Sequence, residues 1–215
     1  MSVRAQDIID EWIVLASDPA GRRLTRDEGL PWLNQVSRDI ARKLKCVEYT
    51  AYFNTLDTDA YLCPDDLVVE TALWWSPSPS DPTTYRKLRE LFKPEFEGMV
   101  NGSYPVGDPR AYYMRANFFH LVPMPTVESP LAGKIDYYGL PDPVASLSDT
   151  IKLSDYLRDA IREGMYVKSM EKLEEVDRGA YQQWLSSVDD NREDRSRDRR
   201  PNIALSNRWR GRGSV

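Results

Sequence analysis

The middle of the chain reads YLCPDD at residues 61–66, GDPRAYY at residues 107–113, LVPMP at residues 121–125 and IDYY at residues 135–138. Aromatic and β-branched residues favour strands, whereas Pro, Gly and Asp favour turns. Such residues build a sheet with rigid turns and are poorly suited to acid, base or nucleophile chemistry. Because helical patterns precede and follow these segments, their order predicts a β region inserted between helices.

Both ends of the chain carry helical periodicity. Residues 5–16 and 25–44 have apolar residues at steps of three and four, which is typical of an amphipathic helix. Thr25 and Glu28 have the spacing of a capping box at the start of the second helix. From Ser148 onward the sequence predicts two further helices, each with one apolar stripe. The two N-terminal helices have only a narrow apolar stripe to bury, and so do the two C-terminal helices. We therefore expect the first and last helices to pack together.

The predicted strands lie between these helical regions. They are residues 47–53, 61–63, 67–75, 111–115, 118–122 and 131–138, with a strand running into a short helix within 84–99. The predicted class is α+β, a helical bundle with an inserted, mainly antiparallel β lobe and an extended C-terminal arm. The expected domains are residues 1–45 with 146–197 for the bundle, 46–145 for the lobe and 198–215 for the arm.

Composition excludes several classes of function. No apolar run is long enough for a transmembrane helix. Cys46 and Cys63 are the only cysteines and His120 is the only histidine, so a zinc site is not expected. The two cysteines lack CxxC spacing and are interpreted as buried thiols. No phosphate-binding or nucleophile-elbow motif is present, and the sequence predicts no cofactor.

Paired carboxylates are the only catalytic groups that the sequence offers. Asp57 with Asp59, and Asp65 with Asp66, lie in predicted turns, where Asp is a common turn former. A carboxylate hydrolase would need two such groups facing each other across a cleft. A carboxylate hydrolase is kept as a third alternative function.

The charge is uneven along the chain. Residues 191–215 carry eight arginines and three acidic residues, whereas the whole chain has a formal net charge of −5. Near the C-terminus, Arg208 and Arg210 flank Trp209, and Arg210 and Arg212 alternate with Gly211 and Gly213. This pattern is typical of nucleic-acid-binding RGG segments, but it also suits an arm that binds an acidic protein groove. An inert terminus is the third alternative.

Trp74 and Trp75 end a predicted strand, beside the proline-rich loop 76–82. In a regular strand, consecutive side chains point to opposite faces, so both indoles cannot face one core. One reading is that one of them faces solvent or a partner, because aromatic residues are enriched at interfaces. The other reading, which is favoured, is burial in the core or at the seam of the lobe.

Taken together, these segments resemble the tailed-bacteriophage head-to-tail adaptor family. The matching segments are Trp32–Asn34 with Ile40, residues 61–66, Gly107–Pro109 with Tyr112, residues 121–125, residues 135–138, and the closing helices with Ala160 and Ala180–Tyr181. The resemblance covers about residues 5–190.

The resemblance implies a structural virion protein that is not an enzyme. Many copies, commonly twelve, would form a ring at the head–tail junction, between the portal and a downstream tail or nozzle protein. Viral DNA would pass through the channel without sequence-specific binding, and no membrane would be involved. Assembly would take place in the cytoplasm of the host bacterium.

Two sets of contact residues follow as hypotheses. Arg208, Trp209, Arg210 and Arg212 would bind the portal, and Trp75, Pro77 and Pro79 would contact the tail protein. The alternative function is a nucleic-acid-binding accessory protein that acts through the Arg/Gly tail.

Overall fold

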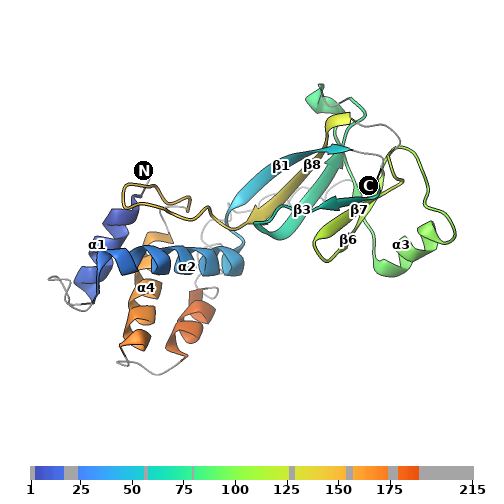
Figure 1. Cartoon of the computed structure of the whole chain (residues 1–215). Coiled ribbons are helices and arrows are strands. Elements are labelled where there is room, and N and C mark those ends of the chain that lie inside the picture. Colours follow the sequence, from blue (N-terminus) through green and yellow to red (C-terminus); the bar gives the residue numbers. More distant parts are fainter. Residues whose placement is uncertain are drawn as a thin grey trace, which may run out of the picture. The chain divides into compact units, whose positions relative to one another are not determined.

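The chain folds into two compact units (Figure 1). The computed structural model describes residues 3–16, 24–55, 58–78, 80–125, 129–153, 157–173 and 179–188. The helical unit is built from residues up to 44 and from 142 onward, and the β unit spans residues 45–141. The predicted α+β class is confirmed, because helices from the two ends pack together and both sheets belong to the inserted region.

The helical unit contains α1 (Ala5–Leu15), α2 (Arg26–Leu44), α4 (Arg158–Lys172) and a further helix at residues 180–188. α1 contacts both α2 and α4. Trp12 is fully buried, and its indole N–H donates to Ser169 Oγ at 3.2 Å. Its ring also meets Trp32 edge-on, with 5.4 Å between ring centres. The indole therefore joins α1 to both partner helices.

The start of α2 has the predicted capping box. The Glu28 backbone N–H donates to Thr25 Oγ1 at 3.3 Å, and the Thr25 N–H donates to Glu28 Oε2 at 3.3 Å. These two bonds satisfy N–H groups that the first turn of a helix leaves open. Pro31 lies inside α2 without ending it.

The predicted helix start at Ser148 is wrong. The Asp149 carboxylate accepts the backbone N–H groups of Ala145 and Ser146, each at 2.9 Å, and so closes a turn. The chain then runs beside Val3, whose C=O accepts the Ile151 N–H at 3.0 Å. A short polar side chain that binds nearby backbone competes with helix formation, which explains the turn at residues 145–149; α4 begins at Arg158.

Gly164 on α4 makes room for an indole. A Cβ at this position would lie 2.3 Å from the Trp184 ring and 2.8 Å from Val36 Cγ1. The small residue of the predicted stripe thus lets the 180–188 helix and α2 approach α4 closely.

The β unit contains two four-stranded sheets. In the first sheet the order is β1 (Glu48–Thr55), β8 (Ser129–Gly139), β3 (Leu67–Trp75) and β4 (Arg86–Lys87). In the second it is β2 (Ala60–Leu62), β7 (Phe118–Val122), β6 (Ala111–Arg115) and β5 (Arg89–Glu90). All pairs are antiparallel except β5 with β6. β3, β6 and β7 have the predicted bounds, and the strand-then-helix prediction for 84–99 is confirmed by β4, β5 and α3 (Lys93–Val100).

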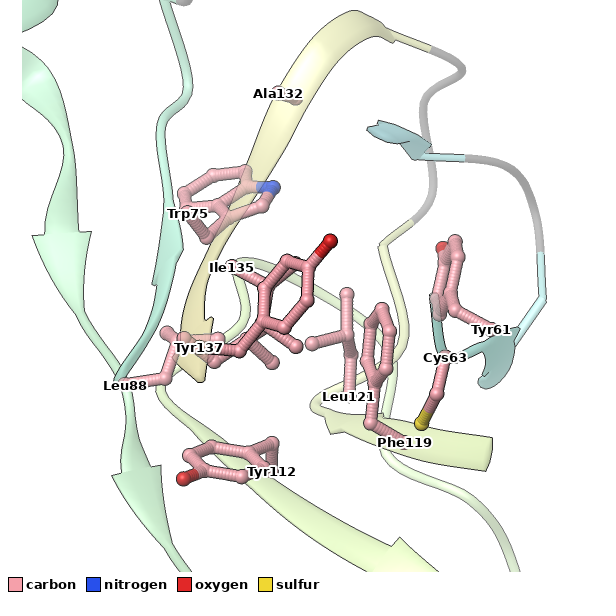
Figure 2. Packing of buried hydrophobic residues seen from close by; sticks show 11 residues of the cluster. Tyr61, Cys63, Trp75, Leu88, Tyr112, Phe119, Leu121, Ala132, Ile135 and Tyr137 are labelled. Carbon is pink, nitrogen blue, oxygen red and sulfur yellow. The ribbon is translucent and has the colours of Figure 1, made fainter. Parts of the chain in front are cut away.

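The core of the β unit draws on the inner faces of both sheets. Figure 2 shows its members, which are Tyr61, Cys63, Leu73, Trp75, Leu88, Tyr112, Phe119, Leu121, Ala132, Ile135 and Tyr137. The Phe53 ring packs against this cluster, with ring centres 4.8 Å from Phe119 and 5.3 Å from Tyr61. Burial, with the charge of Glu70, raises the pKa of the Cys63 thiol, so this thiol stays protonated and unreactive.

The strand pair β4 and β5 ties the two sheets together. β4 pairs with β3 of the first sheet, and β5 pairs with β6 of the second. Between them, Leu88 is buried in the core and its N–H donates to the Leu73 C=O at 2.8 Å. This side of the β unit is therefore closed by one continuous segment.

Candidate functional site

Of the seven predicted contact residues, the structure describes Trp75 and Pro77. Trp75 is only 6 % exposed and lies in the core shown in Figure 2. Pro77 is exposed on the loop after β3. Pro79 and the four arm residues Arg208, Trp209, Arg210 and Arg212 lie outside the described residues.

The loop after β3 is ordered by its own side chains. Ser76 Oγ accepts the Ser78 backbone N–H at 2.9 Å, and Ser76 itself is fully buried. Asp81 Oδ1 accepts the Thr83 N–H at 2.9 Å and so caps a short 3₁₀ turn. The Thr84 hydroxyl donates to the Ser78 C=O at 2.8 Å. These bonds hold the described residues Ser76, Ser78 and 81–84, and local order of this kind lowers the entropy cost of binding.

Trp74, the neighbour of Trp75, faces outward. Its indole N–H donates to Asp136 Oδ2 at 2.7 Å, and Lys134 Nζ lies 4.8 Å from the centre of its ring. Thr50 Oγ1 donates to the other carboxylate oxygen of Asp136 at 2.8 Å. On the outer face of the first sheet, the half-buried Trp74 indole therefore lies in a polar cluster whose members bind one another. Side chains alternate along β3, so Trp75 points inward like Leu73 and Trp74 points outward. In the sequence, alternation separates the two indoles, and a count from Leu73 would have decided which one points outward.

A second outward group lies at the end of the same sheet. Tyr52 and Leu131 are 55 % and 53 % exposed. Tyr85 packs edge-on against Tyr52 at 6.2 Å, and its hydroxyl donates to the Leu131 C=O. Leu131 has a positive φ of 57°, which is uncommon for a residue other than glycine. Exposed aromatic and aliphatic groups of this kind are typical of protein contact surfaces.

The outer face of the second sheet is partly covered by α3. Phe96 of α3 stacks on Tyr113, with ring centres 4.6 Å apart, and lies 5.6 Å from His120. His120 Nδ1 is 3.0 Å from Asp59 Oδ2. The histidine is therefore a packed strand residue with a carboxylate partner. Leu62 and Phe118, which are paired across β2 and β7, are both exposed.

A protein-family model described as SU10 adaptor protein matches residues 3–211. The chain belongs to the SU10 adaptor protein family. This is a family of phage head–tail adaptors, so the resemblance inferred from the sequence is confirmed. No curated protein matches the chain.

The described part of this adaptor contains no group of three or more side chains that could hold a metal ion. Neither Cys46 nor Cys63 forms a disulfide. Within the same residues, no helix has the length and apolar character needed to cross a membrane.

One cavity lies in the helical unit of the adaptor. It measures about 390 Å³ and is lined by Trp32, Lys168, Glu171, Lys172 and Gly179. Its charges are matched by neighbours in the same unit. Lys172 Nζ is 2.6 Å from Glu28 Oε1, and the Glu171 carboxylate accepts the Gly179 N–H at 2.8 Å. Burial lowers the pKa of Lys168. Among the described residues of the cavity wall, Lys168 Nζ lies 4.6 Å from the centre of the Tyr181 ring, and Lys172 and Glu171 have the partners named above.

Proposed function

We propose that this chain forms a ring between the portal and a downstream tail or nozzle protein. The observation that carries the proposal is the family match over residues 3–211, which takes in both units. In the ring, commonly of twelve copies, one face of a subunit meets a different face of the next, and closure comes from rotation. The chain acts as a structural virion protein, not as an enzyme.

Charge supports a role as a DNA conduit. The chain has a formal net charge of −5, although its last 25 residues, 191–215, carry eight arginines and three acids. The remainder is consequently acidic. A channel built from acidic subunits repels DNA phosphates and lets the duplex pass without sequence-specific binding. The ring sits at the head–tail junction of the virion after assembly in the host cytoplasm.

The C-terminal arm, residues 198–215, binds the portal in this proposal. Arg208, Arg210 and Arg212 supply charge-assisted hydrogen bonds, and Trp209 supplies a large apolar anchor. Deletion of residues 201–215 is expected to abolish co-sedimentation with purified portal. The matched control replaces the three arginines by lysine, which keeps the charge and the length. Undiminished portal binding by the deletion variant would overturn this assignment.

The β unit contacts the tail protein through the loop after β3. Pro77 is exposed there, Pro79 belongs to the same loop, and Trp75 anchors the base of the loop in the core. Trp75 would therefore act by holding the loop, not by direct contact. A loop-shortened variant that retains Trp75 should yield heads without tails, whereas Pro77→Ser should have a smaller effect. Fully tailed particles from the shortened variant would contradict this contact.

Sizing of the purified chain tests the whole proposal. Alone, the full-length chain should elute as a small species, and with purified portal it should form a ring-sized complex that electron microscopy can resolve. If the chain instead bound DNA through its tail in a salt-dependent manner and ignored the portal, the nucleic-acid-binding alternative would replace the adaptor function.

A further inference from the structure

The β unit is closed on one side and open on the other. β4 and β5 join the sheets on the closed side, whereas β1 and β2 are the edge strands of the two sheets on the other side. β1 is eight residues long, and the structure as described places no strand beside its outer edge. The other three edge strands have two or three residues each. β1 is thus the long edge of the unit.

The hydrogen-bonding groups of alternate β1 residues point to this edge. The Gly139 N–H donates to the Val47 C=O at 2.9 Å, and Glu48 lies opposite Tyr138. In an antiparallel pair, the residues that bond to the partner strand recur every second position. Odd-numbered residues of β1 therefore bond to β8, while the N–H and C=O groups of Thr50 and Tyr52 are directed away from the sheet.

From Glu48 to Phe53, β1 has no Lys, no Pro and no bulge, which are devices that usually protect an edge; its register with β8 shifts only between Phe53 and Thr55. Natural sheets block exposed edges with lysine, proline or very short strands. β1 reads EYTAYFNT, with no Lys and no Pro, whereas the closed side carries Arg86, Lys87 and Arg89. An edge that is long and unprotected is a template for strand addition.

The chemistry around this edge specifies what could pair with it. The described residues between 46 and 66, which include β1 and β2, carry four carboxylates and no Lys or Arg. On the inner side, Tyr49, Ala51 and Phe53 are only partly buried, although they pack against the core. A suitable strand would therefore offer apolar side chains at alternate positions, to complete this layer, and basic residues to match the carboxylates.

We propose that β1 binds an extended, basic segment of the downstream tail protein as an added antiparallel or parallel strand. The proposal rests on the function given above, because it names the mode by which the β unit meets the tail. In this proposal the tail protein contacts both the edge of β1 and the loop after β3.

A proline at an outward-facing position tests the proposal. Thr50→Pro removes the outward N–H while leaving the bonds of the odd-numbered residues to β8, and proline is tolerated on edge strands. Thr50→Val is the matched control, because it loses the same hydroxyl contact with Asp136 but keeps the N–H. In cells infected with virus that lacks this gene, each variant is supplied from a plasmid and tailed particles are counted by electron microscopy.

We expect Thr50→Pro to reduce tail attachment about tenfold or more, which corresponds to the loss of at least one hydrogen bond, and Thr50→Val to match the unaltered chain. Tailed particles at normal numbers with folded Thr50→Pro would overturn strand addition and leave the adaptor function intact. Failure of the unaltered chain itself to restore tails would instead overturn the proposed function.

Hydrogen exchange gives a second test that does not depend on a variant. In the free full-length chain, the amides of Thr50 and Tyr52 should exchange faster than those of Ala51 and Phe53. In intact virions, all four should be protected. If the two even-numbered amides remain fast in virions, no strand is bound at β1 and the proposal is wrong.

Discussion

The contact between Gly133 and Phe53 can be tested by adding one methyl group. A Cβ on Gly133 would lie 2.0 Å from Cζ of Phe53. Carbon atoms in contact normally stay about 3.5–4.0 Å apart, so the ring would have to move by roughly 1.5–2 Å. Phe119 and Tyr61 lie against the same ring and oppose this movement.

The expected cost of Gly133→Ala follows from these contacts. Overpacking costs about 1–3 kcal/mol, and disturbed aromatic pairs add about 0.5–1.5 kcal/mol, so we expect a loss of about 2–4 kcal/mol in the free energy of unfolding. For a unit of this size, each kcal/mol lowers the Tm by roughly 4–8 °C. Calorimetry of the full-length chain should show the drop in the transition of the β unit alone.

Two further variants complete the experiment. Gly98 lies in α3 with no atom within 4 Å of its added Cβ, so Gly98→Ala should leave stability unchanged or raise it by up to about 1 kcal/mol. Adding Phe53→Leu to Gly133→Ala should recover part of the loss, because the two changes share one contact. A fall of less than about 0.5 kcal/mol for Gly133→Ala alone would refute the close packing of the ring on Gly133.

Three more predictions concern the helical unit. Ser169→Ala leaves the buried indole N–H of Trp12 without its acceptor and should lower the free energy of unfolding by about 1–3 kcal/mol in denaturant titrations; an unchanged midpoint would exclude the bond. Thr25→Ala should cost about 1 kcal/mol of stability through loss of the helix cap, and Thr25→Ser, which keeps the hydroxyl, should cost little. The hydrogen bond from Lys172 holds the pKa of Glu28 in the folded chain below its ordinary value of 4.5. The ionised Glu28 side chain therefore stabilises the fold fully above pH 4.5, and this stabilisation is lost as the pH falls through the lower pKa of the folded chain. The stability difference between the unaltered chain and Glu28→Gln should therefore shrink in acid, and a constant difference across this range would contradict the assignment.

The strands were predictable from the sequence because their limits are set locally. β6 and β7 meet at Ala116, a turn residue with a φ of 52°, and both strands have the predicted bounds. The order of strands in each sheet was not predictable. β1 and β8 are neighbours although they lie far apart in the sequence, and such pairing depends on the whole core.

The errors and omissions have specific causes. Apolar spacing after Ser148 suggested a helix, but the Asp149 carboxylate forms a local turn that periodicity does not register. Trp75 was assigned to a contact surface, although its side chain belongs to the inner face and that of Trp74 to the outer face. The open edge of β1 could not be recognised, because an edge is defined by which strands are missing beside it.

The two ends of the inserted region lie side by side. Val47 and Gly139 share a hydrogen bond of 2.9 Å, so the chain enters and leaves the β unit at adjacent positions. A segment attached in this way behaves as a cassette. Recombination or engineering could replace it, or shorten it to a simple linker, with little strain on the helices at either junction. Under the function proposed above, exchange of this unit alone would change the part of the adaptor that contacts the tail protein.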